Sequence, residues 1–556
     1  MTSTFKTRDL LLLLLLCAVA YWWRLGTVGL IDPDEPFYAQ TAREMVETGD
    51  WMTPRIFGHP QFEKPIFFYW MTAASYRVFG QTEFAGRIPS ALPATLMVLL
   101  VYGFGVRFAN RRAGLLAAVV LGTGFEFAIM SRLMLTDIAL ALFIAASMFC
   151  YWLAMEDEEH RGRWVVWHFV WAGMAVLTKG PFASFVMLLA TVSYAVAMKR
   201  PSPYRGRALW VGIAAYLLIN APWYGAMFAW YPRPFWDEFF VRDNFLRLIR
   251  AEHPANNHWW YYVLLLTFGS VPWMPMVVAA SVRAGRGLRH DARLAFLWCW
   301  ILSSLVFLTL AQSKLPSYIF YVFVPLALVI GLMLDDILTR GFRSAGEKRL
   351  LLALGVLQCL VALAAPGMGW LRAAGVAVLP KLAQLSDTAK PFAAPALLVV
   401  GCLALGLVLL WRGRLVPWLA AHALATVGLI VGALSWSLDH VDAFSSARPV
   451  ARKMMAERRG DEPLLSGKFL ARGIHFYTRQ PVTVLASKAQ PFWAAHPVAV
   501  VAGRKGLAEF LKTNPSVLCT LRRSEWPQWE KSEVGKFAGE PQWSGDNVIV
   551  RFAKPR

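Results

Sequence analysis

The sequence predicts an all-α polytopic membrane protein with about thirteen transmembrane helices and a polar C-terminal α/β domain. Hydrophobic residues make up 57% of the 556 residues and the mean hydropathy is +0.45, so the chain is far more apolar than a water-soluble domain. Thirteen segments are apolar over about the 20 residues that a helix needs to cross a bilayer. Lys and Arg gather in alternate short loops, as they do on the cytoplasmic side of membrane proteins.

The predicted spans begin at a leucine-rich N-terminal segment and end at residue 435. They lie near residues 9–29, 85–106, 113–131, 135–155, 164–178, 180–198, 208–227, 259–281, 292–311, 317–338, 348–367, 391–411 and 415–435. The first segment has an alternative interpretation as a cleavable signal peptide, because Ala18-Val19-Ala20 is typical of a cleavage site. The aromatic residues that follow favour an uncleaved span, and both interpretations place residue 31 outside the cytoplasm.

The net charge of +21 follows from this topology and indicates no nucleic-acid partner. Basic pairs such as Arg111-Arg112 and Lys199-Arg200 fall in loops that the span count places inside. The six cysteines are scattered, so neither a disulfide framework nor a cysteine metal site is predicted. The sequence contains no G-x-G-x-x-G or Walker motif, so we expect no nucleotide cofactor.

Two long loops lie on the outer side of the predicted membrane domain, which covers residues 1–435. In the first, residues 31–84, we expect an amphipathic helix over 33–48 on the membrane surface. The apolar stretch 65–79 would reach only about 22 Å as a helix, so it is predicted to lie in the interface rather than to cross. The second loop covers residues 228–258.

Residues 436–556 are predicted to form an α/β domain on the same outer side. This segment is polar and contains the short β-like runs VTVLA, VAVVAG, VLCTL and NVIVRF, with helical stretches between them. Because thirteen spans place the N-terminus and this segment on opposite sides, the domain shares its compartment with the first outer loop.

The first outer loop begins with three carboxylates in the stretch IDPDEPFYAQ, residues 31–40. Asp32 suits an N-cap and Glu35 the third helical position, so these two predict a capping box around Pro33. That interpretation leaves Asp34 available for chemistry. Asp137 begins a predicted span, where helix capping is the simplest explanation.

Five cations on the outer side are not explained by the charge bias of cytoplasmic loops. They are Lys64, Lys179, Arg247, Arg250 and Lys314. Contact with lipid head groups explains any single one of them, but five together indicate an anionic substrate that carries phosphate.

These motifs resemble those of the polyprenyl-phosphate-dependent membrane glycosyltransferases of the GT-C fold, a group related to protein O-mannosyltransferases. They are most similar to the bacterial aminoarabinose transferases of the ArnT type. The resemblance rests on residues 34–70 and on LTD (135–137), LTKGP (177–181) and SKLPSY (313–318). It extends over about residues 30–320 and is weak beyond them.

The resemblance implies an enzyme of the bacterial inner membrane whose site faces the periplasm. It implies transfer of 4-amino-4-deoxy-L-arabinose from undecaprenyl phosphate to a phosphate of lipid A, which weakens the binding of cationic peptides such as polymyxin. The implied catalytic residues are Asp34 and Asp137, and the implied ligands of the donor phosphate are Lys64, Tyr318 and either Arg247 or Arg250. The family pattern has Arg at the position of Phe37. This departure weakens the assignment of the sugar and the acceptor more than that of the reaction.

A divalent metal such as zinc is a further expectation of the resemblance. Glu63 with His253, or with His258 as the second choice, resembles the metal site of the family. Their spacing matches no standard zinc motif, and histidines beside tryptophans are often only surface groups.

Two other functions stay open from the sequence alone. A transferase that acts on protein, glycan or core oligosaccharide would share these motifs. A lipid transporter would be expected to show broken helices in symmetric halves, and no such repeat is found in the sequence.

Overall fold

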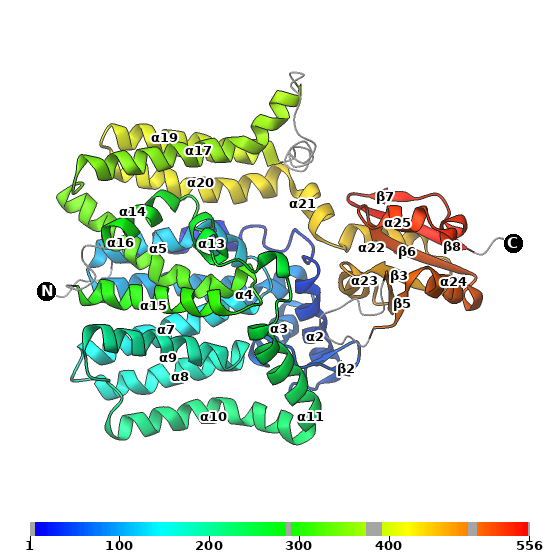
Figure 1. Ribbon diagram of the computed structural model, residues 1–556, viewed down its shortest axis with the longest axis horizontal. Helices are drawn as coiled ribbons and strands as arrows, with labels where there is room; N and C mark the ends of the chain where they lie inside the picture. The colour runs from blue at the N-terminus through cyan, green and yellow to red at the C-terminus, as the bar shows by residue number, and fades with distance from the viewer. Residues whose placement is uncertain (1–5, 285–290, 374–391, 488–497, 554–556) are drawn as a thin grey trace.

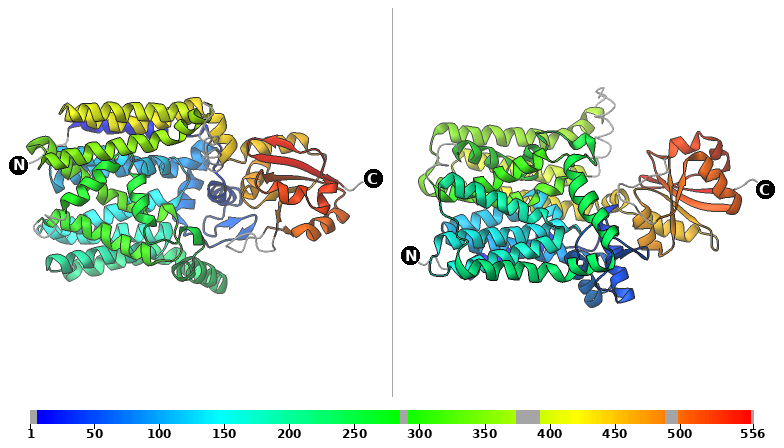
Figure 2. Two further views of the ribbon diagram at one scale, coloured as in Figure 1. Left: turned by 45° about the horizontal axis from the view of Figure 1, so that its top comes forward. Right: turned by 60° about the horizontal axis from the view of Figure 1, so that its bottom comes forward.

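The apolar segments form helices that lie side by side in one bundle, and a strand-containing domain sits at one end of it (Figure 1). The computed structural model describes residues 6–284, 291–373, 392–487 and 498–553. Figure 2 shows the same arrangement from two further directions, with the segment of residues 31–80 between the bundle and the domain. We call the end that carries the domain the domain end.

The helices of the bundle coincide with the predicted spans. They are α1 (Thr7–Cys17) with the π-helix η1 (Ala18–Trp22), α4 (Glu83–Phe108), α5 (Arg111–Gly122), α6 (Phe125–Met130), α7 (Thr136–Glu156), α8 (Arg161–Lys179), α9 (Phe182–Met198), α10 (Gly206–Trp230), α13 (Tyr261–Gly269), α14 (Met274–Ala284), α15 (Ala292–Leu310), the 3-10 helix η4 (Pro316–Val322), α16 (Phe323–Arg340), α17 (Ala345–Ala373), α19 (Ala393–Trp411) and α20 (Leu415–Trp436).

Seven helical segments within the described residues are long and apolar enough to cross a membrane unaided, and the bent pair of α13 and α14 would make an eighth. The remaining predicted spans correspond to helices that are shorter, broken or more polar. The molecule is therefore a polytopic membrane protein, and the count of thirteen crossings stays a prediction.

Two of the predicted spans are broken helices that pack against each other. Residues 113–131 form α5 and α6 around the sequence Gly-Thr-Gly, and α13 and α14 meet at 119°. The Thr123 hydroxyl accepts a hydrogen bond from the Trp273 indole at 2.9 Å, and the Phe125 amide donates to the Val271 carbonyl at 2.7 Å. Each break thus satisfies polar groups that the other exposes, which such breaks require inside a membrane.

The elements of the two outer loops cover the bundle at the domain end. They are α2 (Asp34–Thr48), the hairpin of β1 (Arg55–Ile56) and β2 (His59–Pro60), α3 (Phe67–Phe79), α11 (Pro232–Phe235), the π-helix η2 (Trp236–Leu246), α12 (Arg247–Ile249) and the 3-10 helix η3 (Pro254–Asn256). The predicted helices at 33–48 and 65–79 are both present. The expectation of an amphipathic surface helix was wrong, because every residue of α2 from Glu35 to Met45 is buried.

The C-terminal domain is a six-stranded sheet covered by helices. Its elements are α21 (Leu438–Ser445), α22 (Arg448–Glu457), β3 (Leu464–Gly467), α23 (Ala471–Thr478), β4 (Val482–Ala486), β5 (Val500–Ala502), α24 (Gly503–Thr513), β6 (Ser516–Arg522), α25 (Trp526–Glu530), the 3-10 helix η6 (Glu533–Phe537), β7 (Gln542–Ser544) and β8 (Asn547–Ala553). The strand order is β5-β4-β3-β6-β8-β7. The first four strands are parallel, and β8 pairs antiparallel with both β6 and β7.

Two separate apolar cores lie on the two faces of this sheet. One contains Leu507, Leu511 and Trp526 from α24 and α25. The other contains Val450 and Ile474 from α22 and α23. The helix α23 therefore lies on the face of the sheet that turns toward α2 and the bundle (Figure 1).

Candidate active site

A cavity of about 460 Å³ opens at the domain end between α9, α15, η2 and the first outer loop. Its polar lining consists of Glu63, Lys64, Lys179, Asp243, Asn244, Arg247, Ser313 and Tyr318. The rest of the wall is apolar, and part of it is a rim of exposed side chains that includes Phe185, Phe245 and Leu248. A charged end joined to an apolar wall is suited to a lipid with an anionic head group.

Asp243 holds two of the cavity's cations. Its carboxylate is nearly buried, with 3% of the side chain exposed, and lies 3.4 Å from the Lys64 ammonium and 3.6 Å from the Arg247 guanidinium. Arg242 approaches the same carboxylate at 3.5 Å. These contacts arise in the π-helix η2, a wide-turn form that is rare and often found at functional sites.

Arg247, Tyr318 and Lys179 form the other side of the charged end. The Arg247 guanidinium donates to the Tyr318 hydroxyl at 2.7 Å, and the Lys179 ammonium lies 4.8 Å from the centre of the Tyr318 ring. Lys179 also donates to the Asp137 carboxylate at 2.5 Å. Asp137 therefore does not cap α7, which begins without a side-chain cap, and the capping interpretation was wrong.

The cavity retains donors that its own walls do not use. The Nε atom of Arg247 and the Ser313 hydroxyl are buried and have no hydrogen-bond partner within the described residues. Buried donors of this kind are normally satisfied. An anion bound in the cavity would supply acceptors to both.

Asp34 lies beside this cavity, at the start of α2. Its carboxyl reaches open space, but the protein that surrounds it limits its hydration and raises its pKa above the ordinary range. The charges of Arg472 and Lys64 oppose this increase in pKa, and those of Glu63 and Asp137 add to it. Asp34 is thus close enough to Lys64 and Asp137, which the sequence also singled out, for their charges to affect its pKa.

Asp32 and Glu35, the carboxylates near Asp34 in the sequence, do not form the predicted capping box. Asp32 accepts hydrogen bonds from the amides of Ala447 at 2.7 Å and Gly473 at 3.1 Å, both in the C-terminal domain. Glu35 pairs with Arg87 at 2.6 Å. The predicted capping box was wrong, since α2 begins without a side-chain cap and Asp32 turns toward the domain instead.

Phe37 also faces the C-terminal domain. It is buried, and the guanidinium of Arg472 lies 4.8 Å from the centre of its ring. Where the family pattern led us to expect Arg, this chain therefore has an aromatic ring with an arginine from α23 above it. Such cation–aromatic contacts favour a fixed position of the guanidinium.

The other predicted residues lie outside the cavity. Arg250 is exposed, so Arg247 is the arginine of the pair that lines the cavity. Lys314 is buried and donates to Asn257 and to the Ala311 carbonyl, each at 2.6 Å, which fixes the second outer loop to the start of η4.

The predicted metal ligands differ in their surroundings. Glu63 lines the cavity, whereas His253 and His258 are exposed and His258 stacks on Trp260 with 4.7 Å between ring centres. Among the residues that the structure describes, no group of three or more His, Cys, Asp or Glu side chains could hold a metal ion. The metal site with Glu63 and His253 stays a prediction.

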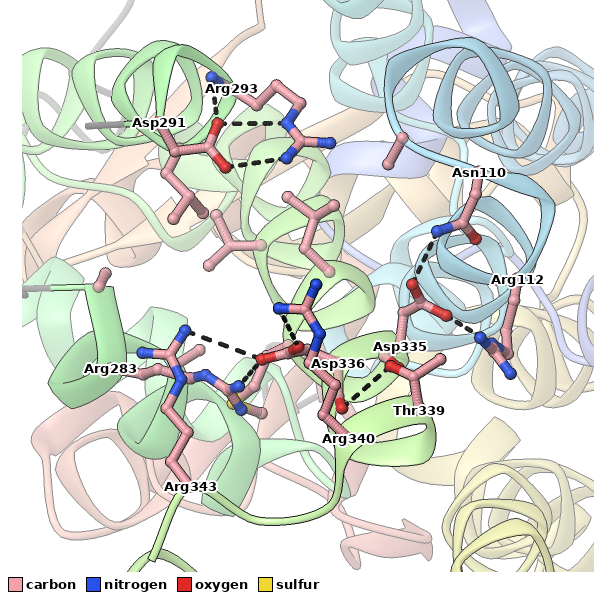
Figure 3. A pocket seen from close by; sticks show the side chains of 17 residues that line it. Asn110, Arg112, Arg283, Asp291, Arg293, Asp335, Asp336, Thr339, Arg340 and Arg343 are labelled. Atoms are coloured by element: carbon pink, nitrogen blue, oxygen red, sulfur yellow. Dashed lines mark hydrogen bonds and ion pairs between the residues drawn. The ribbon is translucent and has the colours of Figure 1, made fainter. Parts of the chain in front are cut away.

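A second cavity of about 460 Å³ lies among the opposite ends of α5, α14 and α16 (Figure 3). Five arginines and three aspartates line it. Arg112 pairs with Asp335, Arg293 with Asp291, and the remaining three, Arg283, Arg340 and Arg343, with Asp336. Because this cavity lies at the end of the bundle away from Asp34 and the two outer loops, we assign the chemistry to the cavity at the domain end.

The comparisons with known proteins agree with this architecture. A family model described as dolichyl-phosphate-mannose-protein mannosyltransferase matches residues 7–237. An undecaprenyl phosphate-alpha-4-amino-4-deoxy-L-arabinose arabinosyl transferase of Pseudomonas paraeruginosa is 32% identical over 422 residues, which are 75% of this chain and 74% of that protein. The chain belongs to the family of these arabinosyl transferases.

Further members of the arabinosyl transferase family match shorter stretches. Transferase 1 of this name from Pseudomonas fluorescens is 33% identical over 358 residues, 63% of each chain. The matches to this protein and two other relatives span 63%, 58% and 59% of the relatives' lengths, so the chain spans about three fifths of them.

A solved structure of the family has the same fold. The crystal structure of ArnT from Cupriavidus metallidurans bound to undecaprenyl phosphate superimposes with a TM-score of 0.77 at 22% identity. It covers 99% of this chain and 100% of that one. The fold is therefore GT-C, with helices in the membrane domain and strands in the C-terminal domain.

Proposed function

We propose that this protein is a glycosyltransferase that moves 4-amino-4-deoxy-L-arabinose from undecaprenyl phosphate to a phosphate group of lipid A. The reaction would take place at the periplasmic face of the bacterial inner membrane. Membership of the arabinosyl transferase family supports the sugar and the donor. Transfer would reduce the negative charge of lipid A and with it the binding of cationic peptides such as polymyxin.

The observation that carries this proposal is the combination of charges and apolar walls in one cavity. Lys64, Lys179 and Arg247 meet with Tyr318 at one end, and apolar side chains, many of them phenylalanines, line most of the remainder. Three cations favour a phosphate, and an apolar rim facing the bilayer favours a long hydrocarbon chain. A polyprenyl phosphate has both parts.

In the proposed reaction, an ionised lipid A phosphate oxygen attacks the anomeric carbon of the sugar. The bond from that carbon to the undecaprenyl phosphate oxygen breaks, and its electron pair stays on the departing phosphate. Lys64, Lys179 and Arg247 stabilise this charge, and the Tyr318 hydroxyl helps to orient it. A single displacement of this kind inverts the anomeric carbon and requires no net proton transfer.

Asp34 then has a role other than general base. An ionised phosphate acceptor needs no deprotonation, so the Asp34 carboxylate is free to stabilise positive charge that develops on the sugar or to bind the sugar ammonium. Asp137 acts through Lys179, whose ammonium it holds at 2.5 Å. With a hydroxyl acceptor, Asp34 would instead take the proton.

Single substitutions test these assignments. We expect Lys64→Ala and Asp34→Asn each to lower the rate of transfer by about a hundredfold or more, because each removes a charge that acts on the transition state. The measurement is mass spectrometry of lipid A from cells that lack the native activity, at equal levels of folded protein. If the Asp34→Asn variant modified lipid A to the wild-type level, the Asp34 carboxylate would have only a structural role.

A protein acceptor is the second candidate, because the matched family model is that of a protein mannosyltransferase. The same cells distinguish the two acceptors. Sugar on the proteins of the cell envelope, with unmodified lipid A, would support the second candidate.

A further inference from the structure

The C-terminal domain places an arginine directly above the catalytic region. Arg472 is the second residue of α23, and its guanidinium lies 4.8 Å from the Phe37 ring centre. Of the charged neighbours of Asp34, Arg472 has the largest effect on the pKa of that carboxyl. The arginine and the aspartate are therefore close together although they belong to different domains.

The position of Arg472 is fixed by its neighbours in the chain. The amide of Gly473 donates to Asp32 at 3.1 Å, and the same carboxylate accepts from Ala447 at the start of α22. Ile474 is fully buried in the core beneath the sheet. A guanidinium on such a rigid element is a better anion ligand than one on a mobile loop, because less conformational entropy is lost on binding.

Arg472 does not belong to the cavity that binds the donor phosphate in the proposed function. The cavity is lined by Lys64, Lys179 and Arg247, and every described lining residue comes from the membrane domain or its loops. The charges of Lys64 and of Arg472 both lower the pKa of the Asp34 carboxyl. The structure thus has two separate sets of cations with the candidate catalytic carboxylate near both.

Transfer of a sugar between two phosphates needs this kind of division. A single displacement requires the leaving and attacking oxygens on opposite sides of the anomeric carbon, so two anionic groups must be held apart by the sugar. Lys468, four residues before Arg472, adds a second cation: the burial that lowers its pKa is reinforced by Arg472 and opposed by Glu252. Glu252 also lies 3.4 Å from Arg247, which lines the cavity.

We propose that Arg472 of the C-terminal domain binds the phosphate of the lipid acceptor and positions it for attack, so that this domain completes the substrate site. The inference rests on the proposed function, because it assigns the acceptor half of the same site. The acceptor class is a phosphorylated lipid whose head group projects from the bilayer toward α23.

The test is steady-state kinetics of the purified full-length protein in lipid nanodiscs, with aminoarabinose-phosphoundecaprenol as donor and phosphorylated lipid A as acceptor. Arg472→Ala removes a charge-assisted contact to the acceptor phosphate, so we expect it to raise the KM for lipid A by about tenfold or more. The KM for the donor should change less than about twofold. Arg472→Lys should recover part of the acceptor affinity because it keeps the charge.

Arg523→Ala is the matched control, since Arg523 is an exposed arginine of the same domain whose guanidinium stacks on Trp543. It should leave both KM values unchanged. A direct binding measurement without donor guards against an effect on folding: wild-type protein should prefer phosphorylated over dephosphorylated lipid A, and Arg472→Ala should lose this preference while it still binds undecaprenyl phosphate.

The outcomes separate the two proposals. If the wild-type protein transfers sugar to lipid A and Arg472→Ala keeps the wild-type acceptor KM and phosphate preference, Arg472 does not bind the acceptor and the inference is overturned. If the wild-type protein transfers no sugar to lipid A, the proposed function itself fails and the inference falls with it.

Discussion

At the scale of single residues, the Asp243 carboxylate lies next to two cations of the cavity, Lys64 and Arg247. One nearly buried carboxylate lies between Lys64 and Arg247, which would otherwise repel each other inside a partly apolar cavity. Its contacts of 3.4 and 3.6 Å are long for ion pairs, so the cations remain available to a second anion. We infer that Asp243 positions the two cations and that the donor phosphate joins them when it binds.

Replacing this carboxylate should weaken donor binding. Asp243→Asn removes the carboxylate charge beside Lys64 and one of the two beside Arg247, the other being Glu252, so we expect the KM for the polyprenyl-phosphate donor to rise by about tenfold. Asp237→Asn, an exposed aspartate in the same helix η2, is the control and should have no effect. An unchanged donor KM in Asp243→Asn at an unchanged Tm would show that the cations are positioned by other groups.

The pH dependence of transfer reports on Asp34. The groups that face its carboxyl are Glu63 and Lys64 from the first loop, Asp137 from α7 and Arg472 from α23. Because limited hydration raises the pKa of Asp34, the rate should fall with decreasing pH at a higher pH than an ordinary aspartate would give.

Arg472 opposes that increase in pKa, so its removal should move the acid limb further. We expect the acid limb of kcat in Arg472→Ala to lie at higher pH than in the wild type, and that of Arg523→Ala to coincide with the wild type. An acid limb that stays in place when Arg472 is removed would contradict the proximity of Arg472 and Asp34.

Part of the site could be predicted from the sequence and part could not. The sequence singled out Lys64, Lys179 and Arg247 because cations are not expected in loops on the outer side, and Tyr318 because it belongs to the SKLPSY motif. All four line one cavity. Asp243 lies among other charged residues in a loop, so nothing in the sequence separates it from a solvated acid. Arg472 could not be found this way, since its place depends on how the C-terminal domain docks.

At the scale of elements, α2 and α23 form the joint between the membrane domain and the C-terminal domain. Asp32 binds two amides of the domain, and the Arg43 guanidinium donates to the Phe476 carbonyl at 2.8 Å. A Cβ atom on Gly473 would lie 2.4 Å from an Asp32 carboxylate oxygen, so glycine is required for this close approach. Any loss of this joint would also displace Arg472.

The joint is tested by Asp32→Asn. The amide group of Asn would turn a donor toward one of the two backbone amides, so we expect a cost of about 1–3 kcal/mol in the docking of the domain. Thermal unfolding of the purified protein should show a lower Tm, and the rate of transfer should fall as well. Asp439→Asn, at an exposed position of α21, should unfold like the wild type.

Helices and strands followed the sequence pattern unequally. Long periodic segments such as α4, α7 and α16 lie where hydropathy predicts them, and α2 begins within one residue of its predicted start. The strands β3 and β7 were not predicted, because four and three residues give too little alternation to recognise. The break between α5 and α6 depends on hydrogen bonds to distant residues, which hydropathy does not report.

At the scale of the whole molecule, the C-terminal domain and the cavity must share one side of the membrane if Arg472 is to act on a substrate bound in the cavity. The domain contacts α2 at one end of the bundle (Figure 1). Residues of the two outer loops at that end line the cavity. The loops at the other end, such as that between α7 and α8, carry Arg161 and Arg163. The charge pattern alone predicted this arrangement, because a fold must place alternate loops on alternate sides.

Accessibility of introduced cysteines tests the sidedness. We expect Lys505→Cys, exposed on α24, to react with a membrane-impermeant maleimide in intact spheroplasts. Arg163→Cys, exposed at the start of α8, should react only after the cells are lysed. Labelling of both positions in intact spheroplasts would contradict the predicted topology.

The most direct test of the central claim is transfer by the purified protein from aminoarabinose-phosphoundecaprenol to lipid A, with the product identified by mass spectrometry. We expect the wild type to form a lipid A phosphate that carries the sugar, and Lys64→Ala and Asp34→Asn each to reduce the rate of its formation by about a hundredfold or more. Unmodified lipid A with the wild type, or equal product from both variants, would contradict it.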